Sequence, residues 1–162
     1  MYTVIKRIEI AGAHRLNLPY ESKCETLHGH NWIVEVEITG ERLNISGMLI
    51  DFTCISKVVN QLDHIYVNEV LPKDMNPTAE NIACWVACSV DEELSLQQYE
   101  EMKSELIRLR KVEADLSKEE ECNRYGQVIE HELDKREKKL SYASVSKVTV
   151  QESEGNIACY IP

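Results

Sequence analysis

The sequence is short of basic residues. Its 18 lysines and arginines are outnumbered by 28 aspartates and glutamates, which gives a net charge of −10. A protein with this charge repels phosphate backbones, so we expect no nucleic acid partner. An anionic small molecule is not excluded, because a metal ion or a helix N-terminus can dominate a pocket locally.

The sequence also lacks a long apolar run: no stretch approaches the roughly 18 residues needed to cross a membrane. The N-terminal segment 1–6 resembles a strand and not a signal peptide. Six cysteines are scattered along the chain, so we expect reduced thiols and a cytoplasmic protein. The 162 residues, 43 % of them apolar, suit one globular domain over 1–162.

Hydrophobic periodicity predicts an α+β fold. Alternation of apolar and polar residues indicates strands at 2–11, 30–38, 145–151 and 157–161. Helical spacing follows Asp51, and a second helix is expected to begin near 76–78, where Pro77 suits a first turn. The order predicts a four-stranded antiparallel sheet with two helices on one face.

Residues 92–141 differ from the rest, with fourteen acids, ten bases, one glycine and no proline. Apolar residues at helical spacing run from Tyr99 to Leu116, and Ser117–Glu120 resembles a capping box. We expect an inserted antiparallel helical hairpin or, less favoured, one long helix. Its role is more naturally packing or assembly than catalysis, and His131 within it is expected to be solvated.

Three of the five histidines, His14, His28 and His30, lie in or beside the connection between the first two strands. An i, i+2 pair on an extended backbone points both rings to one side, and His14 would come from the neighbouring strand end. Three imidazoles that leave a fourth position open are typical of a catalytic zinc site. Copper, nickel or iron remain open on ligand type, as does a plain pair of surface histidines.

Other candidate residues surround this group in the sequence. Cys24, four residues before His28, could act as a base or nucleophile, ligate the metal, or be an inert loop thiol. Asp63 and His64 could form a proton relay, although a histidine at a helix C-terminus needs no such role. Glu152, after a predicted strand, could accept two N–H donors from a 2-amino-4-oxo heterocycle, or be an exposed turn residue.

Several segments together resemble the 6-pyruvoyl-tetrahydropterin synthase / 6-carboxy-tetrahydropterin synthase family. They cover about residues 2–91 and 143–161 in family order. The matching segments are Ala13-His14-Arg15-Leu16, Cys24-Glu25-Thr26-Leu27-His28-Gly29-His30, Ile50-Asp51-Phe52, Leu62-Asp63-His64, Asn76-Pro77-Thr78-Ala79-Glu80-Asn81 and Glu152.

The resemblance implies a tunnelling fold that assembles through trimers into a hexamer, with active sites at subunit interfaces. It implies zinc bound by His14, His28 and His30, Cys24 as general base or acid, and Asp63 and His64 as a proton relay. Glu152 would anchor the pterin ring and Thr78 would line the same pocket. The implied substrate is 7,8-dihydroneopterin triphosphate.

Two departures from the family pattern leave the branch open. The charged insertion at about 92–141 replaces a short link, and Glu25 stands beside Cys24. Cys24 favours the 6-carboxy branch, which releases acetaldehyde and triphosphate on the way to queuosine-type deazapurines. Glu25 is a candidate substrate-binding residue. Because some relatives use a glutamate near this position to cut the side chain, it also keeps open cleavage to 6-hydroxymethyl-dihydropterin for folate synthesis. The 6-pyruvoyl activity also stays open, as does a non-catalytic assembly protein that uses the insertion.

Overall fold

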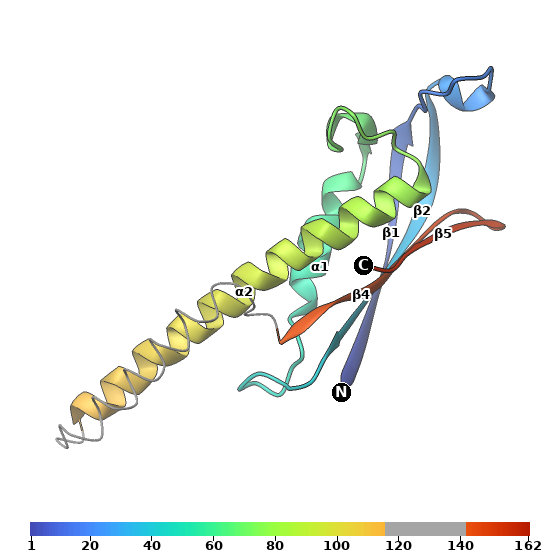
Figure 1. Ribbon diagram of the computed structural model, residues 1–162. Helices are drawn as coiled ribbons and strands as arrows, with labels where there is room; N and C mark the ends of the chain where they lie inside the picture. Colours follow the sequence, from blue (N-terminus) through green and yellow to red (C-terminus); the bar gives the residue numbers. More distant parts are fainter. Residues whose placement is uncertain (116–141) are drawn as a thin grey trace. The chain divides into compact units, whose positions relative to one another are not determined.

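The computed structural model describes residues 1–115 and 142–162 (Figure 1). Chain contacts divide the protein into two units: one formed by Met1–Leu94 and Tyr142–Pro162, and one formed by Ser95–Ser141. The elements are β1 (Tyr2–His14), η1 (Lys23–Glu25), β2 (His28–Gly40), α1 (Phe52–Val59), η2 (Asn60–Leu62), β3 (Ile65–Tyr66), η3 (Val67–Glu69), α2 (Ala79–Asp115), β4 (Ala143–Ser153) and β5 (Asn156–Tyr160).

The strands form one sheet in the order β3-β1-β2-β4-β5. β1, β2, β4 and β5 pair antiparallel, as the alternation predicted. The short strand β3 adds a fifth member, parallel to β1. Its two residues are too few to show a period of two, so this strand could not be predicted from hydrophobic alternation.

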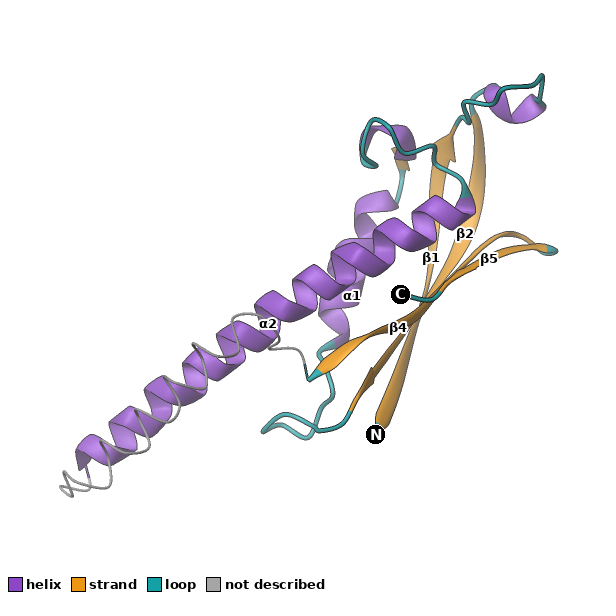
Figure 2. Ribbon diagram, in the orientation of Figure 1, coloured by secondary structure: helices purple, strands orange, loops and turns teal. Residues whose placement is uncertain are grey.

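Both helices lie on the same face of the sheet within the first unit (Figure 2). Asp51 caps α1 by accepting a hydrogen bond from the backbone N–H of Thr53 at 2.8 Å, which is the helix start that the sequence predicted. The covered face carries the buried side chains of alternate strand positions. The largest of these strand residues are Ile10, Trp32 and Ile38. They form one buried cluster with Ile55 of α1, Leu62 of η2 and Ile82 of α2.

The second helix begins where it was expected, but it extends into the segment that was predicted as a separate insertion. Thr78 precedes α2, and its Oγ1 accepts a hydrogen bond from the backbone N–H of Asn81 at 3.3 Å. The helix then continues without interruption through residue 92 to Asp115. The predicted insertion therefore starts inside α2, because residues 79–115 contain no glycine or proline to end the helix. The predicted second arm of the hairpin, with His131, lies outside the described residues.

No helix in the described part of the chain has both the length and the apolar character that a membrane span requires. The cysteines of the described residues are free thiols, namely Cys24, Cys54, Cys84, Cys88 and Cys159. Burial raises the pKa of the Cys54 thiol to about 11, so that this residue is a neutral core side chain at physiological pH.

Gly12 of β1 packs directly against Trp32. A Cβ at this position would lie 2.8 Å from Trp32 Cζ3 and 3.1 Å from the carbonyl oxygen of Leu62. We expect Gly12→Ala to lower the free energy of unfolding by about 1–3 kcal/mol, because an extra methyl group in a close-packed interior forces its neighbours to shift. Urea denaturation measures this effect. Gly155→Ala is the control, since its Cβ would meet nothing within 4 Å; equal stability of the two variants would contradict the tight packing at Gly12.

Candidate metal and catalytic site

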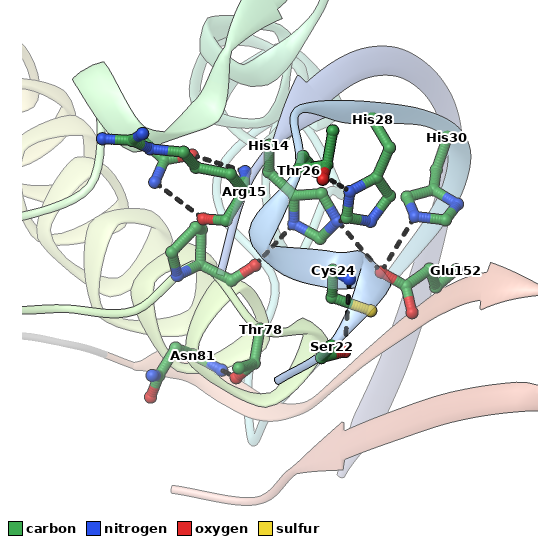
Figure 3. A network of polar contacts seen from close by, with 12 residues as sticks. His14, Arg15, Ser22, Cys24, Thr26, His28, His30, Thr78, Asn81 and Glu152 are labelled. Atoms are coloured by element: carbon green, nitrogen blue, oxygen red, sulfur yellow. Dashed lines mark hydrogen bonds and ion pairs between the residues drawn. The ribbon is translucent and has the colours of Figure 1, made fainter. Parts of the chain in front are cut away.

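Three histidines converge where β1 ends and β2 begins (Figure 3). His14 and His28 are direct cross-strand partners in the register, and His30 lies two residues further along β2 on the same face. One ring nitrogen from each histidine lies within 4.8 Å of the other two. The predicted cluster is therefore present, and it could hold a metal ion.

Backbone carbonyls orient two of the rings. His14 Nδ1 lies 2.7 Å from the Pro77 carbonyl oxygen, and His28 Nδ1 lies 2.7 Å from that of Thr26. Because a carbonyl only accepts, each Nδ1 carries the proton and each Nε2 offers a lone pair. Histidine ligands of metals in proteins are typically held in this way by a second partner.

The two Nε2 atoms of His14 and His28 are only 3.0 Å apart. If both Nδ1 atoms carry protons, two lone pairs face each other at this distance and repel. A shared cation removes the repulsion. Two imidazoles on a tetrahedral zinc ion, with Zn–N bonds of about 2.0–2.1 Å, would have their nitrogens about 3.3 Å apart. The observed spacing is close to that value, so the donor set fits a metal ion.

Burial keeps His14 in the form that binds metals. His14 is fully buried. Burial lowers its pKa, and the neighbouring imidazoles of His28 and His30 act in the same direction, against the Pro77 carbonyl and the Glu152 carboxylate. A neutral imidazole is the ligand form. His30 Nε2 is also buried, and it has no hydrogen-bond partner among the described residues.

Trp32 forms the apolar wall behind the cluster. Its ring centroid lies 5.0 Å from that of His14 and 5.5 Å from that of His30. Trp32 was not among the predicted site residues, although continuing the period of two from His28 through His30 leads to it. The carbonyls of Pro77 and Thr26 were also missed, because a backbone acceptor leaves no mark on residue type.

Glu152 lies at the edge of the cluster. The pairing of β4 with β2, which sets Gln151 opposite Ile33, brings the end of β4 to this point. Glu152 Oε1 is 3.4 Å from the Nε2 atoms of both His14 and His30. At these distances an ion pair forms only with a protonated imidazole, and the Glu152 carboxylate is partly exposed beside the ligand nitrogens.

Cys24 lies in the connection between β1 and β2 and is half-buried. Its carbonyl accepts a hydrogen bond of 2.8 Å from the backbone N–H of Leu16, two residues after His14. Its own N–H donates to Ser22 Oγ at 3.2 Å. The turn that carries the Cys24 thiol is therefore hydrogen-bonded to the chain just after His14, and it leads into β2, which carries His28 and His30.

The structure also shows what Thr78 and Glu25 contact. The Thr78 hydroxyl caps α2, directly after the carbonyl of Pro77 that orients His14. Glu25 Oε2 accepts a hydrogen bond from the backbone N–H of Ser22 at 3.3 Å. Thr78 thus follows a residue that contacts His14, Glu25 lies three residues before His28, and each side chain is hydrogen-bonded to backbone.

Asp63 and His64 are not joined to this group. Asp63 Oδ1 accepts a hydrogen bond from the backbone N–H of Ala11 at 2.9 Å. The His64 side chain is 82 % exposed, and its Nε2 lies 3.8 Å from Asp63 Oδ2. Across residues 1–115 and 142–162, no hydrogen bond or ion pair connects either residue with Cys24 or the histidine cluster.

Sequence comparison identifies relatives of this chain. Residues 3–127 match the family described as 6-pyruvoyl tetrahydropterin synthase. A putative 6-carboxy-5,6,7,8-tetrahydropterin synthase of Pyrococcus horikoshii is 55 % identical over 56 residues, which are 35 % of this chain and 35 % of that relative. The chain thus matches about a third of that protein's length.

Two other relatives match over a longer stretch. The 6-carboxy-5,6,7,8-tetrahydropterin synthase of Synechocystis is 34 % identical over 101 residues, covering 57 % of this chain and 77 % of that protein. The dihydroneopterin monophosphate aldolase of Pyrococcus furiosus is 35 % identical over 88 residues, covering 52 % of this chain and 70 % of that protein.

Solved structures agree on the fold. The 6-pyruvoyl tetrahydropterin synthase of Caenorhabditis elegans superimposes with a TM-score of 0.61 at 20 % identity, covering 99 % of this chain and 95 % of that one. The corresponding protein of Plasmodium vivax gives a TM-score of 0.50 at 19 % identity, with 99 % and 98 % covered. The expected tunnelling fold is confirmed, and the chain belongs to the 6-pyruvoyl tetrahydropterin synthase family.

Proposed function

We propose that this protein is a zinc-dependent lyase that converts 7,8-dihydroneopterin triphosphate to 6-carboxy-5,6,7,8-tetrahydropterin, with release of acetaldehyde and triphosphate. The observation that carries the proposal is the histidine cluster with a cysteine-bearing turn bonded beside it. Relatives named 6-carboxy-5,6,7,8-tetrahydropterin synthase support this branch.

His14, His28 and His30 would hold the zinc ion through their Nε2 atoms. A zinc ion at this position supplies Lewis acidity toward a side-chain hydroxyl of the substrate. The carbonyls of Pro77 and Thr26 keep the two rings in the required tautomer. Trp32 excludes water from the inner side of the cluster, which strengthens its electrostatic effects.

Cys24 would move protons at the side-chain carbons, because its turn adjoins the strands that carry the ligands. Glu152 would accept two N–H groups of the pterin ring, with its partly exposed carboxylate turned to the incoming substrate. Thr78, at the N-terminus of α2, would line the same pocket.

Asp63 and His64 would form a proton relay supplied by a second copy of the chain. The support is their separation from Cys24 within one chain and the exposure of His64. His64 also has a positive φ of 55°, a conformation that costs free energy in a residue other than glycine and is often kept at functional sites. We therefore propose a homo-oligomer, and the resemblance to the family implies that it is built from trimers that stack into a hexamer. We also propose that the protein is cytoplasmic and that its product is used in the synthesis of queuosine-type deazapurines.

A second candidate function is cleavage of the pterin side chain to 6-hydroxymethyl-dihydropterin. The similarity to a dihydroneopterin monophosphate aldolase favours it, as does the presence of Glu25 next to Cys24.

Mass spectrometry of the products separates these functions. The zinc-loaded protein is incubated with 7,8-dihydroneopterin triphosphate, and the expected products are 6-carboxy-5,6,7,8-tetrahydropterin and acetaldehyde. Formation of 6-hydroxymethyl-dihydropterin would replace the proposal with the second candidate. Complete recovery of the unreacted substrate would contradict an enzymatic function and favour a binding or assembly protein.

Glu152→Gln tests the role of the carboxylate. The variant keeps the size of the side chain but removes the charge that would receive two N–H donors. We expect the KM for the pterin to rise about 10-fold or more, the cost of losing a charged hydrogen bond, with zinc content unchanged. Steady-state kinetics and metal analysis measure the two quantities. Glu154→Gln, in the exposed turn that follows, is the matched control; loss of zinc with an unchanged KM would make Glu152 a metal ligand instead.

A further inference from the structure

The turn that carries Cys24 is closed by two reciprocal hydrogen bonds. Ser22 precedes η1, and its side-chain oxygen accepts from the backbone N–H of Cys24 at 3.2 Å. The Glu25 carboxylate reaches back, and its Oε2 accepts from the backbone N–H of Ser22 at 3.3 Å. A bond of 3.2 Å from the Glu25 N–H to the Ser22 carbonyl completes the turn. This arrangement is a capping box.

The capping box fixes one side of Cys24, and Leu16, two residues after the end of β1, fixes the other. The Cys24 N–H is bound by Ser22, and the Cys24 carbonyl is bound by the N–H of Leu16. With both backbone groups of Cys24 engaged, the position of its Cα–Cβ bond is set by these contacts. Figure 3 shows Cys24 and Ser22 in the same close-up as the histidines and Glu152.

We propose that Glu25 is a positioning residue for Cys24 and takes no proton in the reaction. Its carboxylate is bound to the backbone of its own turn. The turn would then present one proton-transferring group, the Cys24 thiol. This inference rests on the proposed function for the role of Cys24. It also deepens that function, because a turn with a single such group suits the 6-carboxy reaction and not cleavage through a glutamate.

Two substitutions at Glu25 separate positioning from proton transfer. Glutamine serves as well as glutamate at this position of a capping box, but it cannot exchange a proton. Alanine removes the acceptor. Loss of a cap raises the equilibrium constant for opening of such a turn roughly five-fold. We expect the Ser22 and Cys24 amide hydrogens to exchange roughly five-fold faster in Glu25→Ala and at the wild-type rate in Glu25→Gln.

Amide exchange of the full chain, followed by NMR, needs no substrate. It therefore tests the capping box even if the proposed reaction does not occur. Exchange in Glu25→Ala at the wild-type rate would overturn the proposal. Glu21→Ala is the matched control, because it removes an exposed carboxylate from the same loop.

Turnover of 7,8-dihydroneopterin triphosphate gives the second readout. We expect a lower kcat with a nearly unchanged KM in Glu25→Ala, and rescue of most of that kcat in Glu25→Gln. If Glu25→Gln is as inactive as Glu25→Ala, the carboxylate transfers a proton and the proposal is wrong. Product analysis of the wild-type protein is independent of this comparison, so the two proposals fail separately.

Discussion

Cys24→Ala is expected to lower the turnover of 7,8-dihydroneopterin triphosphate by about 10²–10⁴-fold, the usual contribution of a positioned acid or base. The reason is that Cys24 is the proposed acid or base of this turn, and the neighbouring Glu25 is proposed only to position it through its hydrogen bond with the Ser22 N–H. Zinc should remain bound, because the cluster contains three imidazoles and no thiol. Steady-state kinetics and metal analysis of the same preparation measure both effects.

Cys159→Ala is the control for this variant. Cys159 is an exposed thiol on β5, where its sulfur lies 3.4 Å from Thr149 Oγ1, and we expect its removal to leave kcat unchanged. Full activity of Cys24→Ala with zinc bound would contradict the role of Cys24. Loss of zinc from Cys24→Ala would instead identify the thiol as a ligand.

His14→Ala is expected to weaken zinc binding by more than about 100-fold. Even the loss of a group that orients a ligand costs 10–100-fold, and this variant removes the ligand itself. The substitution also leaves the Pro77 carbonyl without its partner inside the protein. Competition with a chromophoric chelator measures the dissociation constant.

His64→Ala is the matched control for zinc binding, because its exposed imidazole lies outside the cluster. We expect its zinc affinity to equal that of the wild type. An equal loss of affinity in both variants would indicate that zinc binding is not specific to the cluster, and unchanged binding in His14→Ala would remove this residue from the ligand set.

Much of this site follows from strand periodicity. Once His28 and His30 lie on a strand, a period of two turns both rings to one face, and the antiparallel register sets His14 opposite His28. The histidine cluster is therefore predictable from residue types and their spacing. Glu152 was also singled out from its place after a predicted strand, and the pairing of β4 with β2 brings it to the cluster.

Other features depend on contacts that residue types do not encode. The carbonyls that orient His14 and His28 are backbone groups. The length of α2, by contrast, follows from residue types, because residues 79–115 contain no glycine or proline. The turn at Cys24 is a different case. Ser22 and Glu25 have the spacing of a capping box, the same signature noted in the sequence at Ser117–Glu120. That spacing was a usable signal for the structural role of Glu25, which was predicted as a substrate-binding residue and as a sign of cleavage to 6-hydroxymethyl-dihydropterin.

X-ray absorption at the zinc edge of the zinc-loaded protein tests the metal centre most directly. Three imidazole nitrogens at about 2.0–2.1 Å and one further light atom are expected, which leaves a position for substrate. A sulfur atom at about 2.3 Å would show that Cys24 is bound to the metal. That result, or a protein that retains no zinc, would contradict a three-histidine centre with an open coordination position.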